Sequence, residues 1–313
     1  LALSMIALLV CAPILALMGS WLQWNNASFN VLAELTQTVL PDYIASSLVL
    51  CLGVAFGVTV IGLSTAAAVT LFKFPGQSWI EWALLLPMAM PAYVVAYAYT
   101  DFLQYSGPLQ NLIRHSFALE GRVFPEIRSL GGAIFVFTLA LYPYVYLLVR
   151  SALTERASKL MEAARMLGAP LSRRIASVAL PMARPAIAAG VALALMETLA
   201  DFGVSSYFGI QTFTAGIYKA WLSMDNRIAA AQLATMLLFL VAVLMGLEHR
   251  AQKRMRFSVT RGGRSHSVDA QALALQGRAK WLAWLVCGLP VLVGFVLPVL
   301  FMLRPLLADW SVL

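Results

Sequence analysis

Seven long apolar stretches divide the 313-residue chain, and they limit the folds open to it more than any other feature. They cover residues 1–22, 46–72, 82–100, 129–149, 185–210, 228–247 and 281–303, and six of them contain no charged residue. A helix needs about 20 apolar residues to cross a bilayer, because lipid offers no partners to backbone polar groups. The sequence therefore predicts an all-α integral membrane protein with seven spans.

Composition supports a membrane protein over a soluble one. Only 12% of the residues are charged and 61% are hydrophobic, whereas about a quarter of a soluble domain is charged. The three cysteines, Cys11, Cys51 and Cys287, lie inside apolar stretches, which argues against disulfides. No Cys or His spacing resembles a metal site. We therefore expect no cofactor, no bound metal and no nucleic-acid partner.

The positions of Lys and Arg predict the topology. Fifteen of the 22 basic residues lie in two loops, 150–184 and 248–280. Cytoplasmic loops retain positive charge, so both loops are expected in the cytoplasm. Alternation then places 73–81 and the N-terminus in the cytoplasm, and 104–128 outside.

The 150–184 loop has a regular pattern of its own. Residues 151–167 show the apolar spacing of a helix, and Gly168 is a helix stop signal. Pro170 suits the first turn of a second helix, which we expect to end near Leu180 and Pro181. Such a pair of helices can bury one face against a partner protein or lie on lipid headgroups.

The spacing within this loop resembles a known motif. Glu162, Ala163 and Ala164 are followed by Gly168, and then by Val178, Leu180 and Pro181. This pattern resembles the EAA loop of binding-protein-dependent ABC importer permeases, with Val178 where the family has Ile. The resemblance implies that segment 170–180 is a coupling helix that docks on an ATP-binding subunit. The implied coupling residues are Glu162, Ala163, Ala164, Gly168, Leu171, Arg173, Arg174, Val178, Leu180 and Pro181.

A second resemblance concerns the layout of the chain. Stretches 91–102, 106–110 and 197–203 resemble ferric-iron importer permeases, which fuse two permease halves. It implies that residues 1–22 and 46–247 form a six-helix, MetI-like half. Segment 248–280 would then be a linker, and 281–313 the first helix of a second half. A similarity between residues 9–15 and 285–292 agrees with a repeated half.

The same resemblance implies partners and a location. We expect two copies of an ATP-binding subunit on the cytoplasmic side, a periplasmic or lipid-anchored substrate-binding protein, and surrounding membrane lipid. The location implied is the bacterial inner membrane. The implied function is import, with ferric iron as the substrate and ATP hydrolysed in the separate subunit.

A few polar side chains fall within or beside the spans, where they are costly and usually functional. Glu197 and Asp201 are four residues apart and are expected to share a helix face. Tyr93, Tyr97 and Asp101 repeat at the same spacing near the outer end of the third span. Their oxygens suit hard cations, so they could line a translocation pathway. Alternatively, the tyrosines form an interfacial belt and the carboxylates bond between helices.

The third span contains Pro87 and Pro91, which predict a kinked helix.

Other classes of protein make different demands on the sequence. The chain has no phosphate-binding loop, zinc-protease motif or nucleophile elbow, so ATP chemistry must come from a partner. A secondary transporter would not need the EAA loop. Thiamine permeases share the fused layout, so the substrate stays open.

Overall fold

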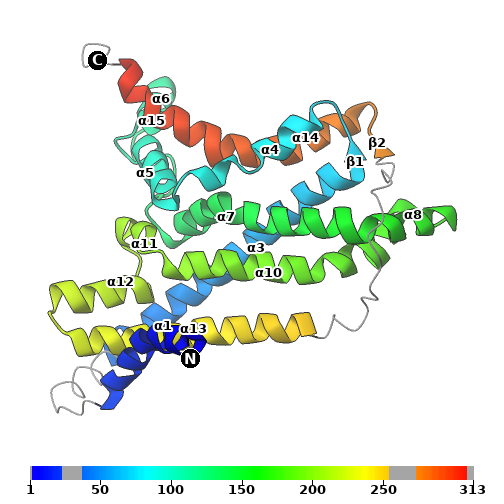
Figure 1. Ribbon diagram of the computed structural model, residues 1–313. Helices are drawn as coiled ribbons and strands as arrows, with labels where there is room; N and C mark the ends of the chain where they lie inside the picture. The colour runs from blue at the N-terminus through cyan, green and yellow to red at the C-terminus, as the bar shows by residue number, and fades with distance from the viewer. Residues whose placement is uncertain (1, 23–36, 254–272, 309–313) are drawn as a thin grey trace.

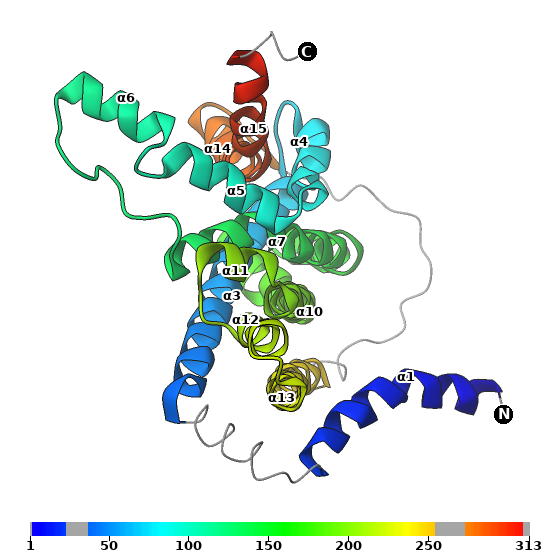
Figure 2. The ribbon, with the colours of Figure 1, turned by 90° about the vertical axis from the view of Figure 1, so that its left-hand side faces the viewer.

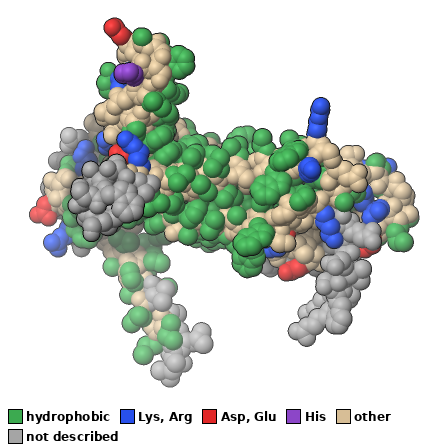
Figure 3. Space-filling view, turned by 90° about the horizontal axis from the view of Figure 1, so that it is seen from above, with side chains coloured by type: hydrophobic (Ala, Val, Ile, Leu, Met, Phe, Trp, Pro, Cys, Tyr) green, Lys and Arg blue, Asp and Glu red, His purple; other side chains and the backbone are tan. Residues whose placement is uncertain are grey.

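The computed structural model describes residues 2–22, 37–253 and 273–308. Five helical segments there are long and apolar enough to cross a bilayer: Leu40–Leu71, Leu130–Glu155, Leu171–Ala200, Arg227–Gly246 and Arg278–Arg304. A bent pair, Gln77–Ala89 with Ala92–Phe117, makes a sixth candidate span. Hydrophobic side chains cover the middle of the molecule, and Lys and Arg gather toward its ends (Figure 3). The distribution fits a protein embedded in lipid.

The core forms around α7 (Leu130–Ala152), which packs between α3 (Leu40–Leu71) and α10 (Leu180–Ala200) (Figures 1 and 2). Within its span 72% is buried, against 22–28% in the other four. Glycines let α3 approach closely: a Cβ at Gly53 or Gly62 would lie 2.6 Å from Ile134 or Val145. Small residues serve this purpose at membrane helix contacts, where van der Waals packing replaces the hydrophobic effect.

The third predicted span, 82–100, is not one helix. It consists of α4 (Gln77–Ala83), the 3₁₀ turn η2 (Leu86–Ala89) and α5 (Ala92–Leu103), followed by α6 (Pro108–Phe117). The two parts differ in direction by 88°. Pro87 lies in the first turn of η2, and Pro91 is the N-cap of α5. At these positions the backbone N–H that proline lacks would have no hydrogen-bond partner within the helix. The predicted kink is confirmed, but it separates two helices.

The fifth span also differs from its prediction. The short helix α9 (Leu171–Arg174), the π-helical turn η4 (Ile175–Ala179) and α10 form one continuous segment. The sequence predicts that a helix ends near Pro181, but in the structure the helix continues past this residue. Pro181 lacks the N–H that would bond back into η4, and a π turn can accommodate that gap.

This span ends earlier than the predicted residue 210. Asp201 has extended backbone angles (φ −71°, ψ 125°), and a separate short helix, α11 (Gly203–Phe208), follows. Asp201 is the C-cap of α10, and its N–H bonds to the Glu197 carbonyl at 3.0 Å, so the two residues still lie one turn apart at the end of the helix. Asp201 and Gly203 interrupt the apolar stretch directly after Ala200, where the helix ends.

The remaining elements complete the chain. They are α1 (Ala2–Gly19), η1 (Ser20–Leu22), β1 (Phe72–Lys73), η3 (Leu153–Ala157), α8 (Ser158–Met166), α12 (Phe213–Tyr218), η5 (Lys219–Ser223), α13 (Arg227–Lys253), β2 (Leu273–Ala274), α14 (Arg278–Val291), η7 (Leu292–Val296) and α15 (Leu297–Ala308). The predicted linker 248–280 is helical up to Lys253, and its residues 254–272 lie outside the described part.

Segments far apart in sequence meet along α14 and α15. Strand β1 pairs in parallel with β2, and the Trp284 indole donates to the Pro75 carbonyl at 2.9 Å. Further along, the Tyr99 hydroxyl donates to the Val293 carbonyl at 2.5 Å. The seventh predicted span thus packs against α3, α4 and α5.

Candidate functional site

The EAA residues form a helical hairpin at one end of the bundle. Helix α7 continues through the π-helical turn η3 into α8, which ends at Met166 (Figure 1). The Gly168 N–H bonds to the Arg165 carbonyl at 2.9 Å, and the Ala169 N–H to the Ala164 carbonyl at 3.0 Å. These are the two bonds of a Schellman motif. Gly168 adopts φ +77°, a left-handed conformation that glycine favours.

The hairpin presents apolar side chains to its surroundings. Leu160 is 51% exposed, and Met166 and Leu167 are each 87% exposed. Glu162 and Ala163 are exposed beside them, and Ala164 is half-buried. Exposed apolar groups of this size at one tip indicate an interaction surface.

The segment 170–180, the expected docking helix, is helical and has one buried and one exposed face. Its larger apolar side chains, Leu171, Ile175 and Val178, pack against the protein's own core. Of its polar residues, Arg173 is exposed and Arg174 is half-buried. Leu180 is partly exposed and Pro181 half-buried, farther along the same helix. The free apolar surface therefore lies on α8 and the turn.

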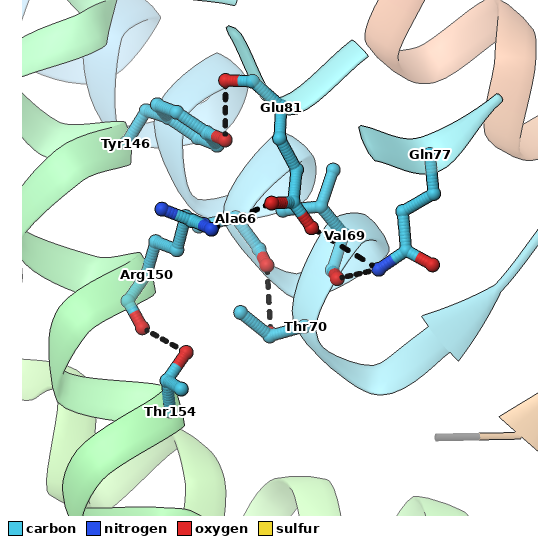
Figure 4. A network of polar contacts seen from close by, with 8 residues as sticks. All are labelled: Ala66, Val69, Thr70, Gln77, Glu81, Tyr146, Arg150 and Thr154. Carbon is cyan, nitrogen blue, oxygen red and sulfur yellow. Dashed lines mark hydrogen bonds and ion pairs between the residues drawn. The ribbon is translucent and has the colours of Figure 1, made fainter. Parts of the chain in front are cut away.

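A polar network holds the root of the hairpin (Figure 4). Arg150 Nη2 lies 2.6 Å from Glu81 Oε2, and the Tyr146 hydroxyl donates to the Glu81 carbonyl at 3.1 Å. Sequence reasoning missed this pair, treating Arg150 only as a topology signal. The common cytoplasmic placement of loops 73–81 and 150–184 was the one available sign that the two could meet.

The predicted pathway residues gather at the opposite end, where α5 packs against α11 (Figure 1). A Cβ at Gly203 would lie 3.0 Å from that of Tyr93 and 3.7 Å from Asp201 Oδ2. The rings of Tyr97 and Tyr207 are 6.1 Å apart. The structure thus brings Tyr93 and Tyr97 together with the segment around Asp201.

The carboxylates of this cluster differ in their surroundings. Asp201 Oδ1 accepts the Val204 N–H at 2.8 Å, so it caps α11. Burial raises the pKa of this carboxyl, and hydrogen bonds from the Val204 and Ser205 backbone lower it. Glu197 is exposed in the last turn of α10, and Asp101 is half-buried near the end of α5. Asp201 therefore has a structural role, whereas Glu197 remains free to face a pathway.

Two further features of the structure concern which substrates the protein could transport. Among the described residues, no group of three His, Cys, Asp or Glu side chains is placed to hold a metal ion. An apolar cavity of about 460 Å³ lies between α3, α7 and α14, and its polar side chains are only Ser64 and Thr138. Such walls suit acyl chains and not a charged substrate.

Comparison with known proteins identifies the family. Residues 58–257, which include the whole hairpin, match the profile of the binding-protein-dependent transport system inner membrane component. The chain belongs to this family. It is accordingly an ABC transporter permease, and the resemblance seen in the EAA loop is confirmed.

Two curated permeases illustrate the range of relatives. The Fe(3+)-transport system permease protein FbpB 2 of Haemophilus influenzae is 25% identical over 208 residues, covering 66% of this chain and 37% of that protein. The putative 2-aminoethylphosphonate transport system permease protein PhnU of Salmonella choleraesuis is 28% identical over 177 residues, covering 55% and 62%. The chain thus spans less than two thirds of either relative.

A solved structure confirms the permease fold. A bacterial alginate ABC transporter, in complex with alginate pentasaccharide-bound periplasmic protein, aligns with a TM-score of 0.65 at 18% identity. The alignment covers 80% of this permease and 92% of the matched chain. The predicted all-α, MetI-like architecture is therefore correct.

Proposed function

We propose that this permease forms the translocation pathway of an importer and couples ATP hydrolysis by two partner subunits to the uptake of ferric iron. The observation that carries the proposal is the EAA hairpin. Its Schellman turn at Gly168 reverses the chain after α8, and Met166 and Leu167 stand exposed at its tip. A rigid apolar tip of this kind can insert into a groove on a partner.

The docking surface includes the exposed side chains of Leu160, Met166, Leu167 and Arg173. The 170–180 segment, which the resemblance implies is the coupling helix, packs Leu171, Ile175 and Val178 inside the permease and offers its other, exposed face to the partner. Movement of a docked tip passes into the membrane along two helices, since α8 continues α7 and α9 continues into α10. Closure of the ATP-binding subunits would thereby shift both helices of the core.

The opposite end supports a cationic substrate. Glu197 lies in the last turn of α10 and Asp101 near the end of α5, and hard oxygen donors such as their carboxylates suit Fe(III). Arg128, a basic residue there, donates to the Tyr207 carbonyl. The iron-permease relative points the same way. An anionic phosphonate would be repelled by those carboxylates, whereas thiamine, an organic cation, remains the competing substrate.

The test is uptake by a reconstituted complex. The permease, together with any segments that complete it in its natural protein, is purified with its ATP-binding and substrate-binding proteins and placed in liposomes. We expect ATP-dependent accumulation of radiolabelled ferric iron, and none of labelled thiamine or 2-aminoethylphosphonate. Accumulation of either organic compound without iron would refute the substrate. Failure of any ATP-binding subunit to co-purify would refute the coupling role.

A further inference from the structure

The polar network of Figure 4 lies where the EAA hairpin leaves the bundle, and the EAA motif does not include it. Glu81 and Arg150 are 69 residues apart in sequence and form an ion pair of 2.6 Å. Their side chains are 23% and 41% exposed. Solvent therefore screens the attraction between the two charges only in part. The pair holds its two helices together more strongly than a fully exposed pair would.

Further hydrogen bonds fix Glu81 in place. The Tyr146 hydroxyl, from a fully buried residue of α7, donates to the Glu81 backbone carbonyl. Gln77 Nε2 donates to Glu81 Oε1 at 3.2 Å and to the Val69 carbonyl of α3 at 2.6 Å. Tyr146 and Arg150 are one turn apart and share a face of α7. Helix α7 therefore contacts one residue of α4 through both its backbone and its side chain.

The two partners occupy positions that matter for movement. Arg150 stands in the last turn of α7, just before the π-helical turn η3 and the hairpin helix α8. Glu81 stands in α4, and the turn η2 leads from α4 to the break that turns the chain by 88° into α5. The far end of that break carries Tyr93, beside Asp201 and α11. One ion pair thus joins the root of the hairpin to the broken span.

We infer that Glu81 and Arg150 are positioning residues that transmit movement of the EAA hairpin to the broken span α4–α5. This inference rests on the proposed coupling function. When a partner draws the hairpin, α7 moves with it, and the ion pair obliges α4 to follow. The break after α4 then converts that shift into a change of direction of α5, next to the proposed pathway. Without the pair, α7 can move while α4 lags behind, so ATP is hydrolysed with less transport.

The chain offers a matched control pair. Arg122 and Glu126 form an ion pair of 3.2 Å within a single loop, and their side chains are 56% and 55% exposed. This pair joins no two helices, so its loss cannot uncouple the hairpin from α5. Exposed pairs of this type contribute little to stability, and Arg122→Gln should leave the complex unchanged.

The measurement is the amount of radiolabelled ferric iron moved per ATP hydrolysed by the complete reconstituted complex. The variants are Glu81→Gln, Arg150→Gln and the reversal Glu81→Arg with Arg150→Glu. Glu81→Gln keeps the shape of the side chain and the backbone bond to Tyr146, so the variant should fold. We expect each single change to lower the ratio about tenfold, a loss of about 1.4 kcal/mol of coupling. The reversal should restore most of it, and Arg122→Gln should not alter it.

Several outcomes would overturn the inference. Single variants with the wild-type ratio would do so, including the case in which their yield falls, because the pair would then be only structural. A reversal no better than the single changes would also do so. A wild-type complex that moves no iron would instead contradict the proposed function, and that failure is recognised before any variant is compared.

Discussion

The two ends of the bundle hold their polar side chains in different ways. At the hairpin end, Glu81 and Arg150 bind each other across two helices. At the opposite end, side chains such as Asp201, Gln110 and Arg128 bind backbone groups: the first accepts the Val204 N–H, and the other two donate to the Leu103 and Tyr207 carbonyls. Backbone capping fixes a loop locally, whereas a link between side chains ties the motion of one helix to another. The difference suggests that one end transmits movement and the other keeps its shape.

These two roles require the two ends of the bundle to face opposite sides of the membrane. In a background without Cys11, Cys51 and Cys287, a single cysteine is placed at Ser172, Leu273 or Glu120. All three positions are exposed, and the first two lie at the hairpin end. An impermeant thiol reagent added outside intact cells should label Glu120→Cys fully and the other two not at all, because basic loops stay in the cytoplasm.

The same labelling can also contradict this placement of the two ends. Permeabilised cells provide the control, since all three cysteines should then react. Labelling of Ser172→Cys from outside would invert the topology. Labelling of Leu273→Cys and Ser172→Cys from different sides would contradict the placement of β2 at the hairpin end.

The next largest effect on transport is expected from a substitution in the turn of the EAA hairpin. Gly168→Val places a β-branched residue at φ +77°, although the space around the Cβ is open. The strain of about 1–3 kcal/mol should distort the Schellman turn and lower transport about tenfold or more, while membrane insertion stays normal. Transport and ATPase activity of the reconstituted complex are the measurements.

Gly168→Asn is the matched control, because asparagine tolerates the left-handed conformation. It should retain most of the activity. If the valine variant hydrolyses ATP at the wild-type rate and transports normally, the turn has no part in coupling. If both variants lose activity equally, the flexibility of glycine matters and not the sign of φ.

The smallest effect is expected at the opposite end, where capping and pathway roles can be separated. Asp201→Ala removes the cap of α11 and should lower the yield of folded protein, at a cost of about 0.5–2 kcal/mol. Asp201→Asn keeps an oxygen for the Val204 N–H and should fold normally. Glu197→Gln removes an exposed charge and should reduce iron uptake per assembled complex a few-fold. Uptake is measured against the amount of assembled complex.

The double variant Glu197→Gln with Asp201→Asn completes this set. A pathway role for both carboxylates predicts a larger fall in uptake per complex than Glu197→Gln alone gives. A fall no larger would assign Asp201 to capping alone. Unchanged uptake in the double variant would eliminate the pathway role and leave both carboxylates as structural groups.

Local signals made part of the site predictable from sequence. Gly168 follows a helical pattern at the spacing of a C-cap, and the turn lies where that pattern predicts. The pattern could not show that Leu171 and Val178 face inward, because that depends on how α9 continues into α10 and packs. The break near Pro87 was predicted as a kink, but its 88° angle depends on tertiary contacts.

Two other features, the end of α10 and the Glu81–Arg150 ion pair, were not predicted from the sequence. The end of α10 at Ala200 falls inside the predicted span 185–210, and the extended backbone of Asp201 marks it. The Glu81–Arg150 pair joins residues 69 positions apart. Loop charge placed both residues on one side of the membrane, and the choice of partner required the packing of α4 against α7.

The contact of α14 and α15 with the first helices has a consequence for the order of synthesis. Tyr99 bonds to Val293, 194 residues later in the chain. At a translation rate of about 5–20 residues per second, the later segment is made about 10–40 s after the earlier one. During that interval the Tyr99 hydroxyl and the outer faces of α3 and α5 meet lipid or another protein. The face that α14 and α15 cover in the folded protein is therefore uncovered while the intervening chain is made.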